Sequence, residues 1–255
     1  MSDPARAPAL AGAAGWSWEI LDGGAFAVAA ALAPSVPGAD LVVYLEGDGA
    51  DYAGPGLPAP DPTPDDPLAL RLALLQGGMA ETPPRSLAWL ARPCQYVRGP
   101  RCGPDCWTTG RYGPEIVAAL ETSLDLLKVR RGARRLWLAG YSGGGALAVL
   151  LAARRADVAG LITVVANLDL AYWGARDGVP LSGSLDPAAV AHQVARLPQV
   201  HFTGGRDRAV GPDVVRAFLR RLPTDAPARM ILCPDCDHCG GWDRDWPGLL
   251  RQAGW

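Results

Sequence analysis

Several features that mark common protein classes are missing from this sequence. No stretch approaches the ~20 uncharged apolar residues that a membrane-spanning helix needs, so no membrane span is predicted. The longest basic blocks are pairs of arginines and the net charge is −2, which argues against a nucleic-acid-binding protein because such proteins usually carry a basic stripe. Hydrophobic residues make up 49% of the chain and charged residues 20%, a composition that argues against general disorder. No internal repeat is present.

The amino terminus also lacks the pattern of an export signal, because no charged segment is followed there by an apolar core. The apolar run 25–33 begins only after Trp16, Glu19 and Asp22, so we interpret it as a strand. The sequence as given therefore predicts a cytoplasmic protein; a periplasmic location would require that a signal had been removed. Residues 1–14 are predicted to be a disordered tail. The sequence makes no prediction of oligomeric state.

What is present is an alternation of apolar strands and helices along 255 residues. Two short apolar runs flank Asp22-Gly23-Gly24 and predict a β-hairpin. Strands are then expected at 41–45, 86–91, 136–139, 161–165, 199–203 and 228–233. Helices are expected at 67–76, 114–131, 144–155, 188–196, 212–222 and 245–252. This alternation predicts one α/β domain, residues 1–255, with a mostly parallel sheet and helices on both faces. Irregular loops are expected at 50–67, 92–112 and 167–187, where they would set specificity.

The segment Gly140-Tyr-Ser-Gly-Gly144 matches the pattern G-x-S-x-G and has a predicted strand before it and an apolar helix after it. That context is what a nucleophilic serine on a tight turn between strand and helix requires. Glycine at 140 and 144 would let the chain turn without a Cβ clash. The alternative is a glycine-rich turn that only packs a helix on a sheet. The context favours Ser142 as a nucleophile.

A serine nucleophile needs a histidine base, and the sequence has only three histidines. His238 follows the last predicted strand, where this architecture places its base. His201 lies inside a predicted strand and is interpreted as a structural, hydrogen-bonded residue. His192 lies on a predicted surface helix and is interpreted as solvated. We therefore predict that His238 is the base.

The acid should lie between serine and histidine in the chain. Asp207 follows the predicted strand 199–203 and would fix the tautomer of His238 by accepting a hydrogen bond from its ring. It could instead be an ordinary turn or helix-capping residue. Asp169, just after the predicted strand 161–165, is the competing acid. We favour Asp207.

An oxyanion hole requires two backbone N–H groups. Gly143 would supply one, because it follows the nucleophile. The loop after strand 41–45 would supply the other, from Gly47 or Asp48. The acidic side chains of Glu46 and Asp48 would oppose a developing negative charge. They are therefore expected to point away, to bind a cationic or hydroxyl-rich substrate group, or to pair with an arginine; the possible partners are Arg98, Arg111 and Arg206.

Six cysteines lie in two local groups, at 94, 102 and 106 and at 233, 236 and 239. Zinc takes four Cys or His ligands at comparable spacings, but two clean C-x₂-C pairs are absent and His238 is needed as the base. We therefore predict no metal. A Cys94–Cys102 disulfide, if the protein is exported, and free thiols are the alternatives that stay open.

Aromatic residues lie in loops expected on the catalytic side: Trp107, Tyr112, Trp173 and Trp242. They are predicted either to line an apolar or sugar-binding pocket or simply to pack in a Trp-rich protein. The full predicted pocket set is Glu46, Tyr141, Trp107, Arg111, Asp169, Trp173 and Trp242.

Several segments together resemble a poorly characterised bacterial group within the α/β-hydrolase superfamily. They are Tyr44-Leu-Glu-Gly-Asp-Gly49, Asp61-Pro-Thr-Pro64, Arg92-Pro-Cys-Gln-Tyr96, Trp107-Thr-x-x-Arg-Tyr112, Gly140-Tyr-Ser-Gly-Gly-Gly145 and Asn167-Leu-Asp169. The resemblance covers roughly residues 40–250 and implies an α/β-hydrolase fold with little or no cap. Members of the group often look exported or lipid-anchored, and this sequence departs from them because it starts with neither a signal nor an anchoring cysteine.

These observations predict a serine hydrolase that transfers an acyl group to water, with a small-molecule carboxylic ester as substrate and no cofactor. Thioesters and amides are less favoured substrates. Two alternatives remain: a non-catalytic binding protein with the same fold, and a metal or redox module built on the cysteine cluster. The order serine, aspartate, histidine along the chain favours the enzyme.

Overall fold

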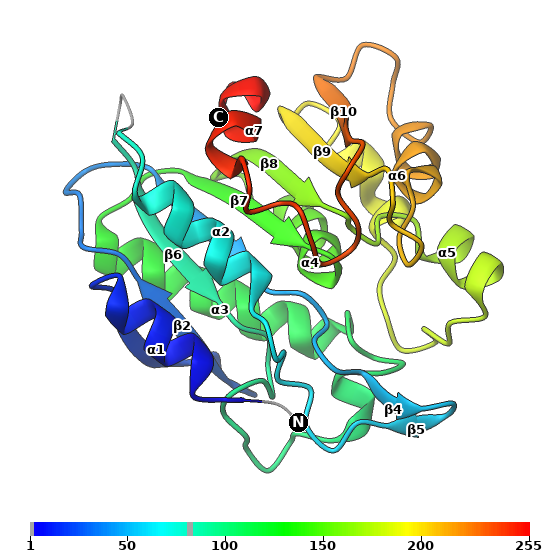
Figure 1. Ribbon diagram of the computed structural model, residues 1–255, viewed down its shortest axis with the longest axis horizontal. Coiled ribbons are helices and arrows are strands. Elements are labelled where there is room, and N and C mark those ends of the chain that lie inside the picture. Colours follow the sequence, from blue (N-terminus) through cyan, green and yellow to red (C-terminus); the bar gives the residue numbers. More distant parts are fainter. Residues whose placement is uncertain (1–2, 81–83) are drawn as a thin grey trace.

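The computed structural model describes residues 3–80 and 84–255, and an eight-stranded sheet runs through its centre (Figure 1). In spatial order the strands are β1 (Ser17–Asp22), β2 (Ala27–Leu32), β6 (Ser86–Leu90), β3 (Leu41–Leu45), β7 (Leu136–Tyr141), β8 (Val158–Val164), β9 (Gln199–Gly204) and β10 (Ala228–Cys233). The pairs β1–β2 and β2–β6 are antiparallel. All other pairs from β6 to β10 are parallel. The predicted mostly parallel sheet is confirmed.

The N-terminal hairpin forms at its predicted turn. Gly24 has φ of 80°, a conformation that suits glycine, and its N–H donates to the Asp22 side chain at 2.9 Å. Parallel strands, by contrast, run in the same direction and therefore all end at the same edge of the sheet. Each is joined to the next by a crossover connection. The loops that follow β3, β7, β8 and β9 consequently meet at one edge, where the residues predicted for the active site lie.

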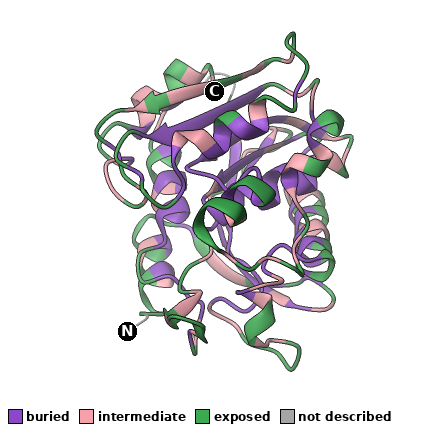
Figure 2. Ribbon diagram, turned by 90° about the vertical axis from the view of Figure 1, so that its right-hand side faces the viewer, coloured by how far each residue is buried: buried purple, intermediate pink, exposed green. Residues whose placement is uncertain are grey.

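Helices cover both faces of the sheet (Figure 1). One face carries α1 (Arg6–Ala13), α2 (Leu68–Gly77) and α7 (Trp246–Ala253), which share a hydrophobic core with one side of the strands. The other carries α3 (Pro114–Arg131), α4 (Gly143–Ala153) and α6 (Pro212–Leu219), which share a second core. In β3, Val43 belongs to the second core and Val42 to the first, because successive side chains in a strand point to opposite faces. Figure 2 shows the central strands mostly as buried and much of the outer helical surface as intermediate or exposed, whereas the edge strands β1 and β10 are largely intermediate or exposed.

Five expectations for terminal, irregular and helical segments need correction. The disordered tail predicted for residues 1–14 is wrong where α1 forms, because this alanine-rich segment favours a helix and buries Ala7 and Ala11 in the core; residues 1 and 2 lie outside the described part. The loop 50–67 contains the small hairpin β4 (Tyr52–Gly54) and β5 (Leu57–Pro58). The segment 167–187 contains α5 (Leu170–Asp177). The helix expected at 188–196 is the 3₁₀ helix η2 (Pro187–Gln193), and a shorter one, η1 (Pro104–Cys106), lies in the loop 92–112.

Four of the six cysteines form disulfides. Cys94 pairs with Cys102, as one of the open alternatives had it, and Cys233 pairs with Cys236. Cys106 and Cys239 are free. Between β8 and β9 the described chain adds only α5 and η2, so no separate cap domain is inserted there. None of the helices in residues 3–80 and 84–255 is long and apolar enough to cross a membrane.

Candidate active site

Ser142 occupies a strained turn between β7 and α4. Its φ of 50° and ψ of −121° lie in a region that non-glycine residues rarely adopt, and such strain is often stored at functional sites. The N–H of Ser142 donates to Val164 O at 2.8 Å, which ties the turn to the neighbouring strand. A Cβ on Gly144 would lie 2.2 Å from Leu45 O. The turn therefore requires the glycine that the motif predicted.

The structure brings Ser142, His238 and Asp207 into one hydrogen-bonded line. Ser142 Oγ lies 3.0 Å from His238 Nε2, and His238 Nδ1 lies 2.9 Å from Asp207 Oδ2. The Asp207 side chain is fully buried, whereas that of His238 is 23% exposed. Because the Asp207 carboxylate can only accept, the proton of the neutral ring belongs on Nδ1 and Nε2 is left to accept from the serine.

The carboxylate and the imidazole are held by their own loops. Asp207 Oδ1 accepts from the N–H groups of Ala209 and Val210 at 2.8 and 2.9 Å. The loops after β9 and β10 are joined where Gly205 N donates to Cys233 O and Arg206 N donates to Cys236 O. These backbone bonds hold Asp207 beside the segment that carries His238.

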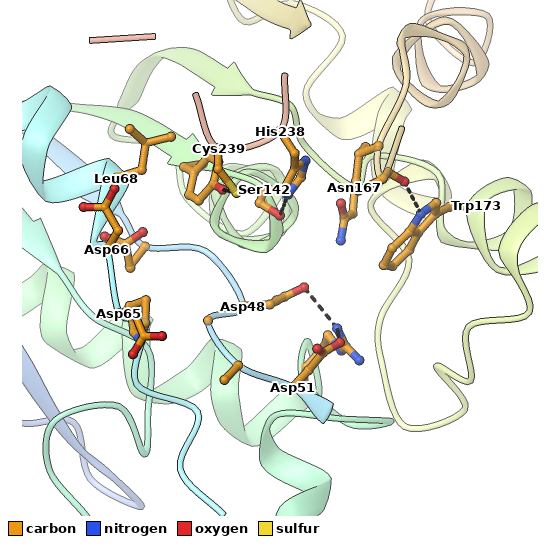
Figure 3. A pocket seen from close by; sticks show the side chains of 18 residues that line it. Asp48, Asp51, Asp65, Asp66, Leu68, Ser142, Asn167, Trp173, His238 and Cys239 are labelled. Carbon is orange, nitrogen blue, oxygen red and sulfur yellow. Dashed lines mark hydrogen bonds and ion pairs between the residues drawn. The ribbon is translucent and has the colours of Figure 1, made fainter. Parts of the chain in front are cut away.

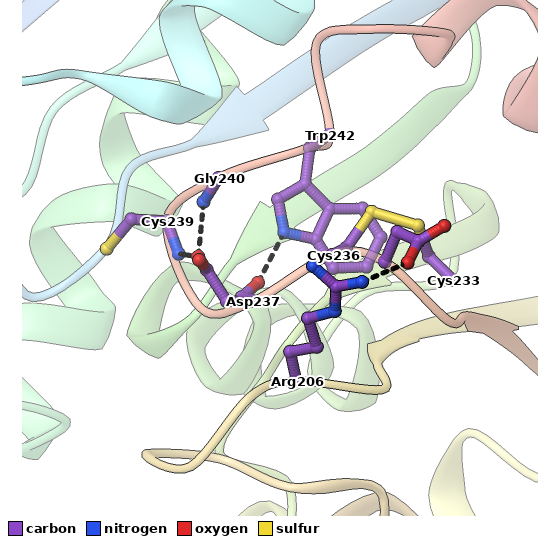
Figure 4. Close-up of a disulfide and its surroundings, with 8 residues drawn as sticks. Arg206, Cys233, Cys236, Asp237, Cys239, Gly240 and Trp242 are labelled. Atoms are coloured by element: carbon purple, nitrogen blue, oxygen red, sulfur yellow. Dashed lines mark hydrogen bonds and ion pairs between the residues drawn. A yellow bond between two sulfur atoms is a disulfide. The ribbon is translucent and has the colours of Figure 1, made fainter.

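The His238 loop is also fixed on its other side (Figure 4). Asp237 Oδ1 accepts from the N–H groups of Cys239 and Gly240, and Asp237 O accepts from Trp242 Nε1. The Cys233–Cys236 disulfide closes the strand end just before it. The loop therefore presents His238 from a rigid frame.

The rival residues lie elsewhere. Asp169 caps α5 by accepting from Tyr172 N at 2.9 Å and pairs with Arg221. His201 is fully buried, bonded to Thr163 Oγ1 at 2.8 Å and Gln199 Oε1 at 3.2 Å, and burial lowers its pKa to about 3. It is thus the neutral structural histidine that the sequence predicted. His192 is exposed.

Gly47 and Asp48, the two residues predicted as alternatives for the second oxyanion donor, are not equivalent. Gly143 is the first residue of α4, and the first N–H groups of a helix have no acceptor within the helix. The N–H of Gly47 donates to Glu46 Oε1 at 3.0 Å. The N–H of Gly47 is therefore engaged, which favours Asp48 as the candidate for the second donor.

Glu46 lies 1% exposed beneath this loop and accepts four hydrogen bonds. Its donors are the backbone N–H groups of Gly47, Ala69 and Leu70 and the indole of Trp89, at 2.9 to 3.3 Å. Burial raises the pKa of Glu46 to about 7, against the lowering effect of these donors. Its side chain ties the loop after β3 to the start of α2.

Asp48 is paired with arginine, as one of the expectations had it. Its carboxylate accepts from Arg92, from Arg111 Nη1 at 3.1 Å and from Tyr112 Oη at 2.8 Å. Burial alone would raise the pKa of Asp48, but the two guanidinium groups outweigh it and lower that pKa. The charge facing Gly143 is therefore neutralised by its neighbours.

Of the three arginines considered as partners, only Arg111 makes this contact. Arg98 donates to Pro60 O, and Arg206 pairs with Asp235. Arg92 was not considered, although it lies two residues after β6, the strand beside β3. Its position as a basic residue just after the strand next to β3 was the sequence signal that could have identified Arg92 as a partner of Asp48.

The serine opens into a pocket of ≈ 490 Å³ (Figure 3). Four predicted pocket residues line it: Glu46, Tyr141, Arg111 and Trp173. Three others do not, because Trp107 and Trp242 are buried with their indoles bonded to Ala59 O and Asp237 O, and Asp169 caps α5. The wall also includes Asp51, Asp65, Asp66 and Asn167, which were not predicted. Asn167 lies in the segment Asn167-Leu-Asp169, which contributes to the resemblance, but no sequence pattern predicted a role for its side chain.

The residues described here, 3–80 and 84–255, contain no group of three or more His, Cys, Asp or Glu side chains placed to hold a metal ion. Cys102, Cys233 and Cys236, which the zinc alternative required as ligands, have their sulfurs in disulfides.

Comparison with known proteins identifies the architecture. No family model and no curated protein matches the sequence. Among solved structures, the esterase Pf2001 of Pyrococcus furiosus superposes with a TM-score of 0.68 at 12% identity, covering 95% of this chain and 90% of that one. The chain has the α/β-hydrolase fold.

Two further solved structures are similar over nearly their whole length. Est1E from Butyrivibrio proteoclasticus gives a TM-score of 0.63 at 13% identity and covers 92% of this chain and 95% of its own. XC6422 from Xanthomonas campestris, described as a serine hydrolase without a lid, gives 0.61 at 16% identity with 93% coverage of each chain. At these identities the α/β-hydrolase fold is shared, and substrate does not follow from fold.

Proposed function

We propose that this protein is a serine hydrolase that cleaves a carboxylic ester through an acyl-serine intermediate. The observation that carries the proposal is the line from Ser142 Oγ through His238 to Asp207, with contacts of 3.0 and 2.9 Å. Its fold neighbours include one protein described as an esterase and one described as a serine hydrolase. These descriptions belong to those proteins and support the proposal by analogy.

In the first half of the reaction, Ser142 Oγ attacks the ester carbonyl carbon while its proton passes to His238 Nε2. The N–H groups of Gly143 and Asp48 bind the oxygen that becomes negative. Asp207 stabilises the imidazolium. His238 then gives its proton to the departing alcohol as the carbon–oxygen bond breaks, and Ser142 remains acylated.

In the second half, water attacks the acyl carbon while His238 Nε2 takes its proton. The carbon–Oγ bond breaks, the proton returns to Ser142, and the free acid leaves. The reaction uses only side chains and backbone N–H groups of this chain.

The proposal is tested by labelling with a fluorophosphonate probe and mapping the labelled peptide. We expect label on Ser142 in the wild type and a loss of ~10³-fold or more in labelling rate with His238→Ala. His192→Ala, which removes an exposed histidine, is the matched control and should label like the wild type.

The acid is tested in the same assay by comparing Asp207→Asn with Asp169→Asn. The first should slow labelling by ~10³ to 10⁴-fold, because an amide stabilises the wrong tautomer. The second keeps a side-chain oxygen that can still cap α5, removes only the charge that pairs with Arg221, and should leave the rate within tenfold. A folded wild type that takes no label would refute the serine mechanism.

A further inference from the structure

Two buried polar atoms in the pocket wall have no hydrogen-bond partner among the residues that the structure describes. They are Asn167 Oδ1 and Arg111 Nη2. Asn167 is 1% exposed and Arg111 is 0% exposed, and both residues line the pocket that contains Ser142. Buried polar atoms are nearly always paired. A free acceptor and a free donor in one wall therefore point to a ligand that supplies the complementary groups.

The orientation of the Asn167 amide is set by a chain of hydrogen bonds. Tyr112 Oη donates to Asp48 Oδ2 at 2.8 Å, and Asn167 Nδ2 donates to Tyr112 Oη at 2.8 Å. Asp48 can only accept, so the single Tyr112 proton is used there and the tyrosine oxygen must accept from the amide nitrogen. The amide oxygen is left as the free group. In Figure 3 the Asn167 side chain lies beside the Ser142–His238 pair, on the same side of the pocket as Trp173.

This chain of hydrogen bonds lies next to the predicted oxyanion site. A Cβ on Gly143 would lie 1.9 Å from Asp48 Oδ1 and 2.8 Å from Tyr112 Oη. Asn167 itself follows β8, whose last residue, Val164, pairs with Tyr141 just before the nucleophile. The free acceptor is therefore placed to meet a group close to the reacting carbonyl.

We infer that the substrate is a hydroxylated ester, one that carries hydroxyl groups close to the scissile bond. The inference rests on the proposed function. A hydroxyl both donates and accepts, so a pair of neighbouring hydroxyls would donate to Asn167 Oδ1 and accept from Arg111 Nη2. A plain alkyl ester would leave both groups buried and unpaired, which is costly.

The charges around the pocket favour hydroxyl groups over an ammonium group. Asp48 and Asp51 are both paired with Arg111, and Asp66 is paired with Arg6 and Arg71. Glu46 is buried beneath four N–H donors. Asp65, which is exposed, is the remaining acid of the lining. A cation entering beside Arg111 would also meet a like charge, which opposes its binding.

The test compares matched esters with and without hydroxyl groups. Glyceryl acetate is compared with propyl acetate, which places the hydroxyls on the alcohol side, and methyl 3-hydroxybutyrate with methyl butyrate, which places one on the acyl side. We expect kcat/KM of the wild type to favour the hydroxylated member of at least one pair by ~10 to 100-fold. In Asn167→Leu and in Arg111→Lys, which lacks the free Nη2, that preference should fall about tenfold.

Thr203→Val is the matched control variant. Thr203 Oγ1 is also buried without a partner, but Thr203 lies in β9 away from the pocket lining. The substrate preference of this variant should equal that of the wild type. A loss of preference in all three variants would indicate a general structural effect and would contradict the assignment.

The outcomes separate this inference from the proposed function. Equal use of both members of each pair, or a preference for acetylcholine over glyceryl acetate, would overturn the inference and leave a serine hydrolase. The same follows if Ser142 takes the fluorophosphonate but no hydroxylated ester is turned over. If Ser142 takes no label and no ester is cleaved, the proposed function itself fails.

Discussion

At the scale of single residues, this protein places two acidic side chains, Glu46 and Asp48, in the pocket lining beside Ser142 and compensates each one differently. Asp48 is neutralised by Arg92 and Arg111, which lower its pKa. Glu46 receives no arginine; it is buried and surrounded by N–H donors, and its pKa is raised to about 7. One carboxylate is therefore ionised throughout the neutral range, whereas the other titrates within it.

The titration of Glu46 predicts how stability depends on pH. Its pKa in the folded state, about 7, lies above the ordinary value of 4.5 that the unfolded chain would show. The contribution of this group to the free energy of unfolding is therefore fully present below about pH 4.5. It is lost as the pH rises to about 7. The total change is on the order of 3 kcal/mol.

We test this by urea unfolding of the wild type and Glu46→Gln at several pH values. The variant cannot titrate, so the difference in unfolding free energy, wild type minus variant, should decrease by ~2 to 3 kcal/mol between pH 5 and pH 8. Lost hydrogen bonds in the variant add a constant that pH does not change. A difference that stayed level would show that Glu46 is ionised throughout this range.

At the scale of elements, the turn from β7 into α4 leaves no room for an added side chain. Gly144 faces Leu45 O and Glu46 O, at 2.2 and 2.5 Å from where a Cβ would stand. Both are backbone atoms at the end of β3 and in the loop that follows it. A side chain at 144 would therefore push apart the two segments whose N–H groups are proposed to bind the same oxygen.

Gly144→Ala and Gly12→Ala, two substitutions in helices, are expected to change the stability of the protein in opposite directions. Gly144→Ala should destabilise the protein by ~3 kcal/mol or more, because overpacking here moves the backbone. Gly12 lies in α1, where an added Cβ would meet no atom within 4 Å apart from its own helix backbone and chain neighbours. Gly12→Ala should therefore stabilise by ~0.5 to 1 kcal/mol through helix propensity. Thermal unfolding of both variants measures this. A Gly144→Ala protein as stable as the wild type would contradict the packing of the turn.

At the scale of the whole molecule, one sheet separates two hydrophobic cores and belongs to both. Leu70 of α2 and Leu147 of α4 are each fully buried, on opposite sides of the strands. Because strands such as β3 contribute alternate side chains to each core, neither core can lose its packing without disturbing the other. The chain is therefore expected to behave as one domain.

Cooperative unfolding tests that expectation. Leu70→Ala and Leu147→Ala each remove a buried side chain at a cost of ~2 to 5 kcal/mol. Both should lower the same single transition by about 5 to 15 °C, seen alike by tryptophan fluorescence and far-UV circular dichroism with the disulfides intact. Two transitions, each moved by only one of the variants, would divide the chain into separate units.

Much of the architecture could be predicted from local patterns. Apolar runs with β-branched residues marked the strands, the helical period marked α3, and the glycines around Ser142 marked the tight turn. The tail at 1–14 and the loop at 167–187 were mispredicted because α1 and α5 depend on tertiary contacts: buried alanines in one case, and in the other a cap from Asp169 with support from Asp186.

By itself, the sequence determined the alternating strands and helices, the serine turn and the chain order of Ser142, Asp207 and His238, because these depend on neighbours along the chain. The tertiary structure decided the features that depend on contacts between residues far apart in the sequence. It occupied the N–H of Gly47 with Glu46 and paired Asp48 with Arg92 as well as Arg111. It also left the oxygen of Asn167 without a partner among the described residues. Hydrogen bonds and ion pairs between distant segments leave no periodic trace, so only the folded chain reveals them.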